Sequence, residues 1–225
     1  MNYLCHARNQ TNAWRAVGTL LPDFLSMFRA SRLRPRKIAS EEILVTAAQK
    51  SLREGVLLHF KEDAWFHTLP VFTSITGDLT SELREVAERE AREQPPRQRP
   101  FRAHFFAHIL LEMLLDAAWE EENQGATEKL YEQLGSLSFS EVEKEVHAFL
   151  RASEVEVLPP VAFSLKRFVE SGLLFDYHDD ERILFRLEQV GSRVRQPPLH
   201  VNSIAVIRAG RPRVRAHLST LLTSP

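Results

Sequence analysis

The sequence contains one cysteine, Cys5, among 225 residues. A single thiol excludes an intramolecular disulfide framework and a zinc site built from several cysteines, and it is typical of a reducing compartment. No run of about 18 apolar residues occurs, so we expect no membrane-spanning helix. The start of the chain lacks a basic stretch followed by an apolar segment, which is the pattern of a signal peptide. We therefore expect a cytoplasmic protein.

The sequence also lacks an excess of charge of either sign. Its 29 Lys and Arg residues nearly balance its 30 Asp and Glu residues, which gives a formal net charge of -1. This balance provides no general attraction to nucleic acid or to an anionic membrane, so we expect no nucleic-acid partner. Any basic site for a partner must therefore be local.

Glycine is scarce, at 8 residues, and alternating runs of the β type are few. Apolar residues instead recur at helical spacing in most segments, which predicts an all-α protein. With 44% hydrophobic residues, the chain is long enough to bury a substantial core. We predict one domain over residues 1–225, built as a bundle of about seven helices.

Helix boundaries follow from capping residues and from prolines. We expect the segment 101–122 to be central, because it is the most hydrophobic. The expected helical segments are 40–66, 82–92 with Thr80 before it, 101–122, 125–137, 138–155, a helix after "LPP", 181–194, and 201–222 with a weak point at Gly210 and Pro212. The stretch "DYHDDE" before residue 181 is typical of a helix break with capping carboxylates, and a metal site there is the less favoured interpretation.

Two ladders of polar side chains lie in these helices. In "GVLLHFKEDAWFHTLPVF", His59, Asp63 and His67 recur at intervals of four. Such residues share one helix face, and the rise of about 1.5 Å per residue places His59 and His67 about 12 Å apart. The second ladder lies in the segment 101–122 and consists of His104, His108, Glu112 and Asp116.

An unpartnered carboxylate in such apolar surroundings costs several kcal/mol, so these groups require partners. If the two ladders face each other, their imidazoles and carboxylates form a metal site inside a bundle. Two ions about 3.5–4 Å apart would use most of the ladder, whereas one ion would leave the outermost residues to orient its ligands. Solvated stripes, or buried histidines bonded to carboxylates, are the alternative interpretation.

Three stretches resemble the acyl carrier protein phosphodiesterase family, in the order found in that family. "MNYLCHA" is similar to its opening, "AVGTLLPDF" to its Gly-Asn-Leu-Leu-Ala-Asp-Phe block, and "GVLLHFKEDAWFHTLPVF" to its Gly-Ile-x-Leu-His block. The central helix with Trp119 and the segment 158–194 also resemble the family. The matched positions are His6, Gly18, Asp23, Gly55, His59, Asp63 and Pro70.

This resemblance implies an all-helical fold related to the HD-type metal-dependent phosphohydrolases. It also implies a divalent metal, typically manganese, and cleavage of the phosphodiester that joins 4′-phosphopantetheine to a serine of acyl carrier protein. On family grounds, His6 and Asp23 join the metal ligands. Asp23, His59 and Asp63 become the candidate catalytic residues.

The chain departs from the family pattern at several positions. Phe60 stands where the family carries Arg, and Thr19 stands where it carries Asn. His67, His108 and Glu112 each stand where the family carries Asp, and Met113 stands where it carries His. Most of the ladder changes exchange one metal-ligand type for another. We therefore expect a metal site with an altered ligand set, and the changes leave open both the family's substrate and a shifted substrate or chemistry.

Imidazole and carboxylate mixtures suit zinc, manganese or iron, as one or two ions. Such an ion activates water for attack on a phosphodiester. The expected inner ligands are His59, Asp63, His108 and Glu112, and the peripheral ones are His67, His104 and Asp116. A basic cluster for substrate phosphate or for an acidic helix of acyl carrier protein is Arg29, Arg32, Arg34, Arg36 and Lys37.

Two other functions fit the same pattern. A helical zinc phospholipase or nuclease-like hydrolase would also use His and Asp ligands from "TLLPDF" and "HILLEMLLD". A catalytically inactive helical interaction protein would keep the scaffold and satisfy the ladders by mutual hydrogen bonds. Bound metal separates the hydrolases from the interaction protein.

Overall fold

The computed structural model describes residues 3–28, 30–91 and 100–223, and every regular element in these ranges is helical. The predicted all-α class is therefore confirmed. These ranges contain more helices than the seven or so expected. The α-helices are α1 (Tyr3–Ala7), α2 (Ala13–Ser26), α3 (Ala47–Phe66), α4 (Pro70–Ala91), α5 (Ala103–Glu122), α6 (Ala126–Gly135), α7 (Phe139–Ala152), α8 (Val161–Ser171), α9 (Asp180–Arg193), α10 (Ser203–Ala216) and α11 (Leu218–Leu222). Short 3-10 segments are η1 (Pro35–Lys37), η2 (Glu41–Ile43) and η3 (Leu173–His178).

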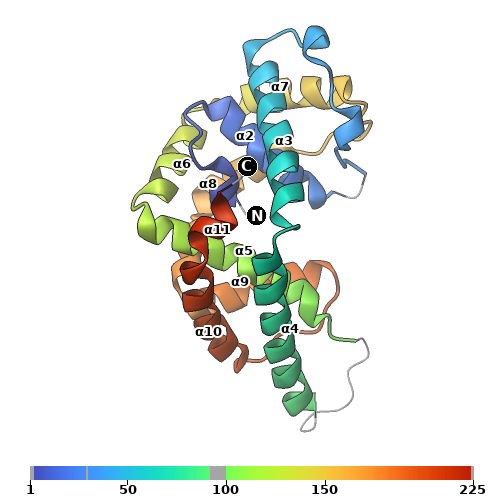
Figure 1. Cartoon of the computed structure of the whole chain (residues 1–225). Helices are drawn as coiled ribbons and strands as arrows, with labels where there is room; N and C mark the ends of the chain where they lie inside the picture. Colours follow the sequence, from blue (N-terminus) through green and yellow to red (C-terminus); the bar gives the residue numbers. More distant parts are fainter. Residues whose placement is uncertain (1–2, 29, 92–99, 224–225) are drawn as a thin grey trace. The chain divides into compact units, whose positions relative to one another are not determined.

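The helices group into two compact units (Figure 1). Unit 1 comprises Tyr3–Ala64 and Asn123–Leu173, so it contains α1, α2, nearly all of α3, and α6 to α8. Unit 2 comprises Trp65–Glu122 and Leu174–Pro225, so it contains α4, α5 and α9 to α11. Each unit thus joins two stretches that are distant in the sequence. The single domain expected over 1–225 stays a prediction.

An aromatic cluster forms part of the core of unit 1. Phe168 of α8 contacts Tyr3 of α1, Phe24 of α2 and Tyr131 of α6, with ring centroids 5.0–5.6 Å apart. Tilted and edge-to-face pairs of this kind contribute about 0.5–1.5 kcal/mol each beyond the burial of their area. The cluster therefore fixes α1 and α2, which carry two of the polar side chains discussed below.

Helices α2 and α3 approach each other so closely in unit 1 that glycine is required on both. A Cβ atom on Gly18 would lie 2.3 Å from the carbonyl oxygen of Leu52, and one on Gly55 would lie 2.2 Å from that of Arg15. Both distances are far shorter than a van der Waals contact, and in each case the obstacle is backbone. This close crossing sets Thr19 of α2 within hydrogen-bond distance of His59 of α3.

We expect Gly55→Ala to lower the free energy of unfolding by at least about 2 kcal/mol, because overpacking against backbone forces the two helices apart. Urea denaturation followed by circular dichroism measures this change. Gly77→Ala in α4 is the matched control, since its added Cβ would meet nothing within 4 Å. That control should be neutral or stabilising by up to about 1 kcal/mol. Equal effects of the two substitutions would contradict the close crossing.

Helix α5 is the centre of unit 2, as its hydrophobicity predicts. It packs against α4, α9, α10 and α11. Four of its leucines, Leu110, Leu111, Leu114 and Leu115, are at most 1% exposed. Burial of each such side chain contributes about 1.5–3 kcal/mol, so α5 is a rigid support for the polar side chains of its first turns.

Three predicted helix boundaries are wrong. The helix expected to follow Thr80 begins at Pro70, since proline is favoured at the first helical position, where no N–H is needed. The helix expected from Ser40 begins at Ala47. The last helix continues through Gly210 and Pro212, and the break falls at His217 between α10 and α11. A Cβ atom on Gly210 would lie 2.7 Å from Leu114 Cδ1, so this glycine lets α10 pack closely on α5. The expected end of the helix after Thr80, at residue 92, lies outside the described residues.

The "DYHDDE" stretch forms a helix break with carboxylates that cap and pair. Asp179 is the N-cap of α9 and accepts a hydrogen bond from the backbone N–H of Arg182 at 2.9 Å, which confirms the predicted capping. Buried Asp176 accepts from the guanidinium groups of Arg182 and Arg186. Because arginines occupy both oxygens of Asp176, its charge is balanced within this stretch.

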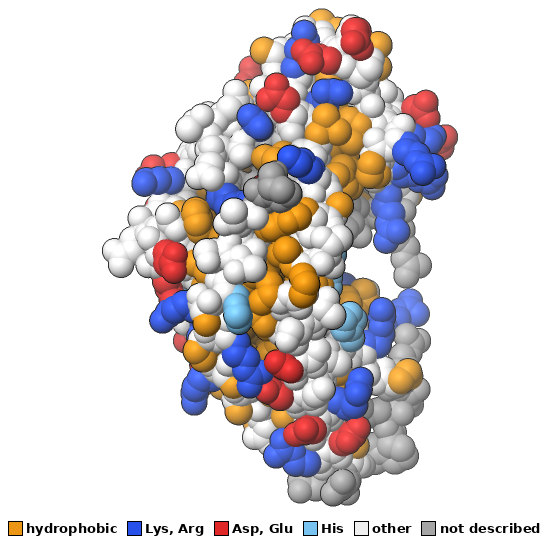
Figure 2. All heavy atoms as spheres, viewed as in Figure 1, with side chains coloured by type: hydrophobic (Ala, Val, Ile, Leu, Met, Phe, Trp, Pro, Cys, Tyr) orange, Lys and Arg blue, Asp and Glu red, His pale blue; other side chains and the backbone are white. Residues whose placement is uncertain are grey.

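The surface carries charges of both signs. Figure 2 shows positive and negative side chains interspersed over the face in view, in keeping with the near-zero net charge.

Among the described residues, none of the helices combines the length and the apolar composition needed to cross a membrane. The predicted absence of a membrane-spanning helix therefore holds for these residues.

Candidate functional site

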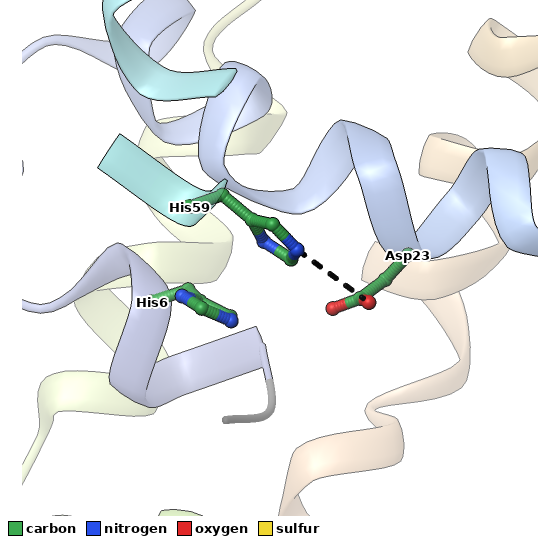
Figure 3. A group of neighbouring side chains, drawn as sticks. All are labelled: His6, Asp23 and His59. Atoms are coloured by element: carbon green, nitrogen blue, oxygen red, sulfur yellow. Dashed lines mark ion pairs between the residues drawn. The ribbon is translucent and has the colours of Figure 1, made fainter. Parts of the chain in front are cut away.

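Three short sequence stretches of unit 1 bring their polar side chains together. His6 from α1, Asp23 from α2 and His59 from α3 offer ligand atoms within 4.8 Å of one another, and we call this group centre 1. The two imidazole rings stack with centroids 4.0 Å apart, and His59 Nε2 lies 4.0 Å from Asp23 Oδ1. Figure 3 shows the imidazole rings of His6 and His59 on one side and the carboxylate of Asp23 facing them.

Both histidines of centre 1 have Nδ1 held by an acceptor. His59 Nδ1 lies 2.8 Å from the carbonyl oxygen of Thr19, and His6 Nδ1 lies 3.3 Å from Glu62 Oε2. A carbonyl or a carboxylate only accepts, so each Nδ1 carries the hydrogen and donates it. The lone pair of each neutral ring is then on Nε2. This is how histidine ligands of metals are oriented in proteins.

Glu62 is itself fixed by an ion pair beneath the site. Its Oε1 lies 2.9 Å from Arg8 Nη2, and both side chains are less than 10% exposed. Arg8 also donates to the carbonyl oxygen of Cys5. Burial raises the pKa of Glu62, while the neighbouring Arg8 guanidinium opposes that rise. The pKa of Glu62 thus lies above its usual range despite Arg8, and the ion pair holds the carboxylate in position next to His6.

The three residues of centre 1 differ in their exposure to solvent. His6 and His59 are 0% and 5% exposed, whereas one third of the Asp23 side chain is exposed. Contact of the group with solvent is therefore greatest at Asp23, and the two imidazoles are buried. Buried histidines with fixed tautomers lose little freedom when they bind an ion.

Unit 2 holds a second group of ligand type, which we call centre 2. It consists of His67, in the turn between α3 and α4, together with His108 and Glu112 on α5. His67 Nε2 lies 3.2 Å from His108 Nε2, and His108 Nε2 lies 3.0 Å from Glu112 Oε1. His67 Nε2 lies 4.0 Å from the same carboxylate oxygen.

The two centres divide the expected inner ligands. His59 lies in centre 1, His108 and Glu112 lie in centre 2, and Asp63 belongs to neither group and is half-buried. The interval of four predicts that His59, Asp63 and His67 lie on one helix face and belong to one site. The structure instead groups His59 with α1 and α2, and it groups His67 with α5.

The remaining ladder residues lie outside both centres. His104 is exposed, and its Nδ1 lies 3.5 Å from Thr80 Oγ1. Asp116 is buried in α5 at 1% exposure. Both are thus separate from the groups of three, although they continue the i, i+4 pattern of His108 and Glu112.

Sequence reasoning missed the residues that support the histidines of centre 1, namely Arg8, Thr19 through its carbonyl, and Glu62. The signal for Glu62 is its position one helical turn after His59, which places a carboxylate on a neighbouring part of the same face. No sequence pattern indicates that it bonds His6, because that contact depends on how α1 packs against α3.

The predicted basic cluster is only partly available for a partner. Arg32, Arg34 and Arg36 are exposed, whereas Lys37 forms an ion pair with Glu154 at 2.5 Å. Arg29 lies outside the described residues. Three arginines of unit 1 therefore stay as candidates for binding an anionic group.

Comparisons with protein families, curated proteins and solved structures found no match for this chain. The family resemblance, the HD-like fold and the substrate therefore stay predictions. The geometry of the two centres is the basis for the proposals that follow.

Proposed function

We propose that the protein is a metal-dependent phosphodiester hydrolase whose reaction takes place at centre 1. The observation that carries the proposal is the pair of buried imidazoles whose Nδ1 atoms are held by Thr19 and Glu62. Their Nε2 atoms and the Asp23 carboxylate are thereby prepared for one divalent cation.

The donor set of centre 1 fits manganese, zinc or iron. Two imidazoles and one carboxylate are preferred by these ions over calcium, which takes oxygen ligands. The 4.0 Å between His59 Nε2 and Asp23 Oδ1 is less than two metal–ligand bonds of about 2.1 Å, so one ion reaches both atoms. When bound, such an ion lowers the pKa of a coordinated water and polarises a phosphoryl oxygen.

The protein's own residues provide position and access. His6 and His59 are buried, so the part of the group that they form is shielded from water. Asp23 is the most exposed of the three ligands, so an incoming phosphodiester meets it first. Arg8 holds the carboxylate of Glu62 in place, and Glu62 keeps His6 in the tautomer that binds metal.

Acyl carrier protein is the substrate we propose, with release of 4′-phosphopantetheine. In support, the three stretches that carry the family resemblance contribute one side chain each to centre 1: His6, Asp23 and His59. An HD-like origin of the fold belongs to the same proposal. The exposed Arg32, Arg34 and Arg36 of unit 1 suit the acidic surface of a carrier protein.

Metal removal tests this function. Protein treated with chelator should lose hydrolysis of a generic phosphodiester such as bis(p-nitrophenyl) phosphate, and Mn²⁺ or Zn²⁺ should restore it. Mass spectrometry of holo acyl carrier protein should show the loss of 4′-phosphopantetheine under the same conditions. Less than about a tenth of an ion per chain, with no thermal shift on adding either metal, would refute hydrolase activity at centre 1. Diesterase activity without release from the carrier protein would refute the substrate alone.

A further inference from the structure

We propose that centre 2 is a second, independent metal site, in which His67, His108 and Glu112 bind one divalent cation of the zinc type. This site lies wholly in unit 2 and shares no residue with centre 1. It goes beyond the proposed hydrolase function, which uses centre 1 alone.

The separations in centre 2 have the dimensions of a metal site. The distances of 3.2, 3.0 and 4.0 Å join the same three atoms, His67 Nε2, His108 Nε2 and Glu112 Oε1. The point equidistant from these atoms in their plane lies about 2.0 Å from each, which matches zinc–nitrogen and zinc–oxygen bonds of about 2.0–2.2 Å. The separations therefore allow one ion to contact all three atoms.

Hydrogen bonding explains this arrangement less well than a metal does. His108 Nε2 carries at most one hydrogen, yet it faces both His67 Nε2 and Glu112 Oε1 at hydrogen-bond distance. If His108 Nε2 donates its hydrogen to Glu112, it has no lone pair left to accept a hydrogen from His67. If it accepts from His67 instead, its lone pair faces the carboxylate oxygen of Glu112 and the two repel. A cation between them turns both contacts into favourable ones.

The surroundings of centre 2 hold the two imidazoles in place. Phe72 presents its ring at about 80° to both, with centroids 4.9 Å from His67 and 5.3 Å from His108. Phe66 packs on Phe72 at 4.8 Å, and both phenylalanines are buried. The turn that carries His67 is closed by hydrogen bonds from the Thr68 and Leu69 amides to Trp65 and Phe66.

An ion in centre 2 would keep an open position. The side chains of His67, His108 and Glu112 are 33%, 31% and 16% exposed, so the group lies at the surface of unit 2. His108 and Glu112 line a pocket of about 600 Å³, together with residues of α4 and α5 such as Arg84 and His104. Three protein ligands with access from a pocket are the arrangement of zinc sites that bind water or an exogenous ligand, whereas structural sites are closed by a fourth side chain.

Titration of metal-free protein with Zn²⁺ tests centre 2. We expect His108→Ala and Glu112→Gln each to bind one ion fewer than the unaltered chain, or to bind that ion at least about 100-fold more weakly, since loss of a supporting residue alone costs about 10–100-fold. His104→Ala, one turn earlier on α5 in the same pocket, is the matched control and should bind the same number of ions. Glu112→Gln preserves side-chain size, so its circular dichroism should match that of the unaltered chain.

The outcome for centre 2 does not depend on centre 1. His59→Ala should leave the ion of centre 2 in place, so a failure of the proposed hydrolase leaves this difference measurable. Visible absorption of bound Co²⁺ should lose the component of centre 2 in Glu112→Gln, a readout that a merely structural role would not change. Equal stoichiometry, affinity and Co²⁺ spectra for the unaltered chain, His108→Ala and Glu112→Gln would overturn the proposal and assign the group to hydrogen bonding.

Discussion

His59→Ala should reduce phosphodiester hydrolysis by at least about 10³-fold and remove the ion of centre 1. A metal supplies several kcal/mol of charge stabilisation in such reactions, and each 1.36 kcal/mol corresponds to about a factor of ten in rate. The position of His59 is restricted, because it is 5% exposed and donates to Thr19 in the adjacent helix. The initial rate with bis(p-nitrophenyl) phosphate and the metal content per chain measure the two effects.

Two further variants separate an effect on metal binding from an effect on folding. Asp23→Asn alters a partly exposed side chain and keeps its size, so it should weaken metal binding and activity while the circular dichroism is unchanged. His147→Ala is the control in unit 1, since His147 bonds the carbonyl oxygen of Pro159 and belongs to neither centre. It should keep full activity. A folded His59→Ala protein with unaltered metal content would exclude His59 as a ligand.

The fold class could be predicted from the sequence because helical periodicity is a local property. The hydrophobic segment around Leu110 and Leu114 must be buried on almost every side, so its central place in unit 2 follows from composition. Boundaries that depend on tertiary packing could not be predicted in the same way. Gly210 resembles a helix breaker, yet it is required for contact with Leu114 and lies within α10.

The candidate site was predicted by residue type but not by grouping. The interval of four identifies residues on one helix face, and it selected His59 and His67, each of which lies in a group of possible metal ligands. It carries no information on which other helix faces them. His59 meets Asp23 and His6 because Gly18 and Gly55 allow α2 and α3 to cross closely, and that crossing is a property of the packed chain.

The support of His6 was beyond sequence reasoning for a related reason. Arg8 and Glu62 are 54 positions apart, and as isolated charges each would be expected on the surface. Both are buried, and buried charges of opposite sign persist only where they pair. The position of Glu62 beneath His6 therefore predicts a role in orienting that histidine, which can be separated experimentally from its role in stability.

Glu62→Gln should weaken metal binding at centre 1 by about 10–100-fold, the usual effect of removing a carboxylate that bonds a histidine ligand. The amide still accepts from His6 Nδ1, but the negative charge that makes the imidazole a stronger ligand is lost. The same change leaves Arg8 buried without its carboxylate, which should lower the free energy of unfolding by about 3–5 kcal/mol. Isothermal titration with Mn²⁺ and urea denaturation measure these two effects separately.

Adding Arg8→Met to Glu62→Gln separates positioning from stability. The double variant has no buried unpaired charge, so it should recover most of the lost free energy of unfolding. Its affinity for Mn²⁺ should stay reduced by about 10–100-fold, because His6 still lacks its ionised partner. A double variant that regains both stability and affinity would mean that Glu62 only balances the charge of Arg8. Recovery of stability alone would identify Glu62 as the residue that positions His6 for metal.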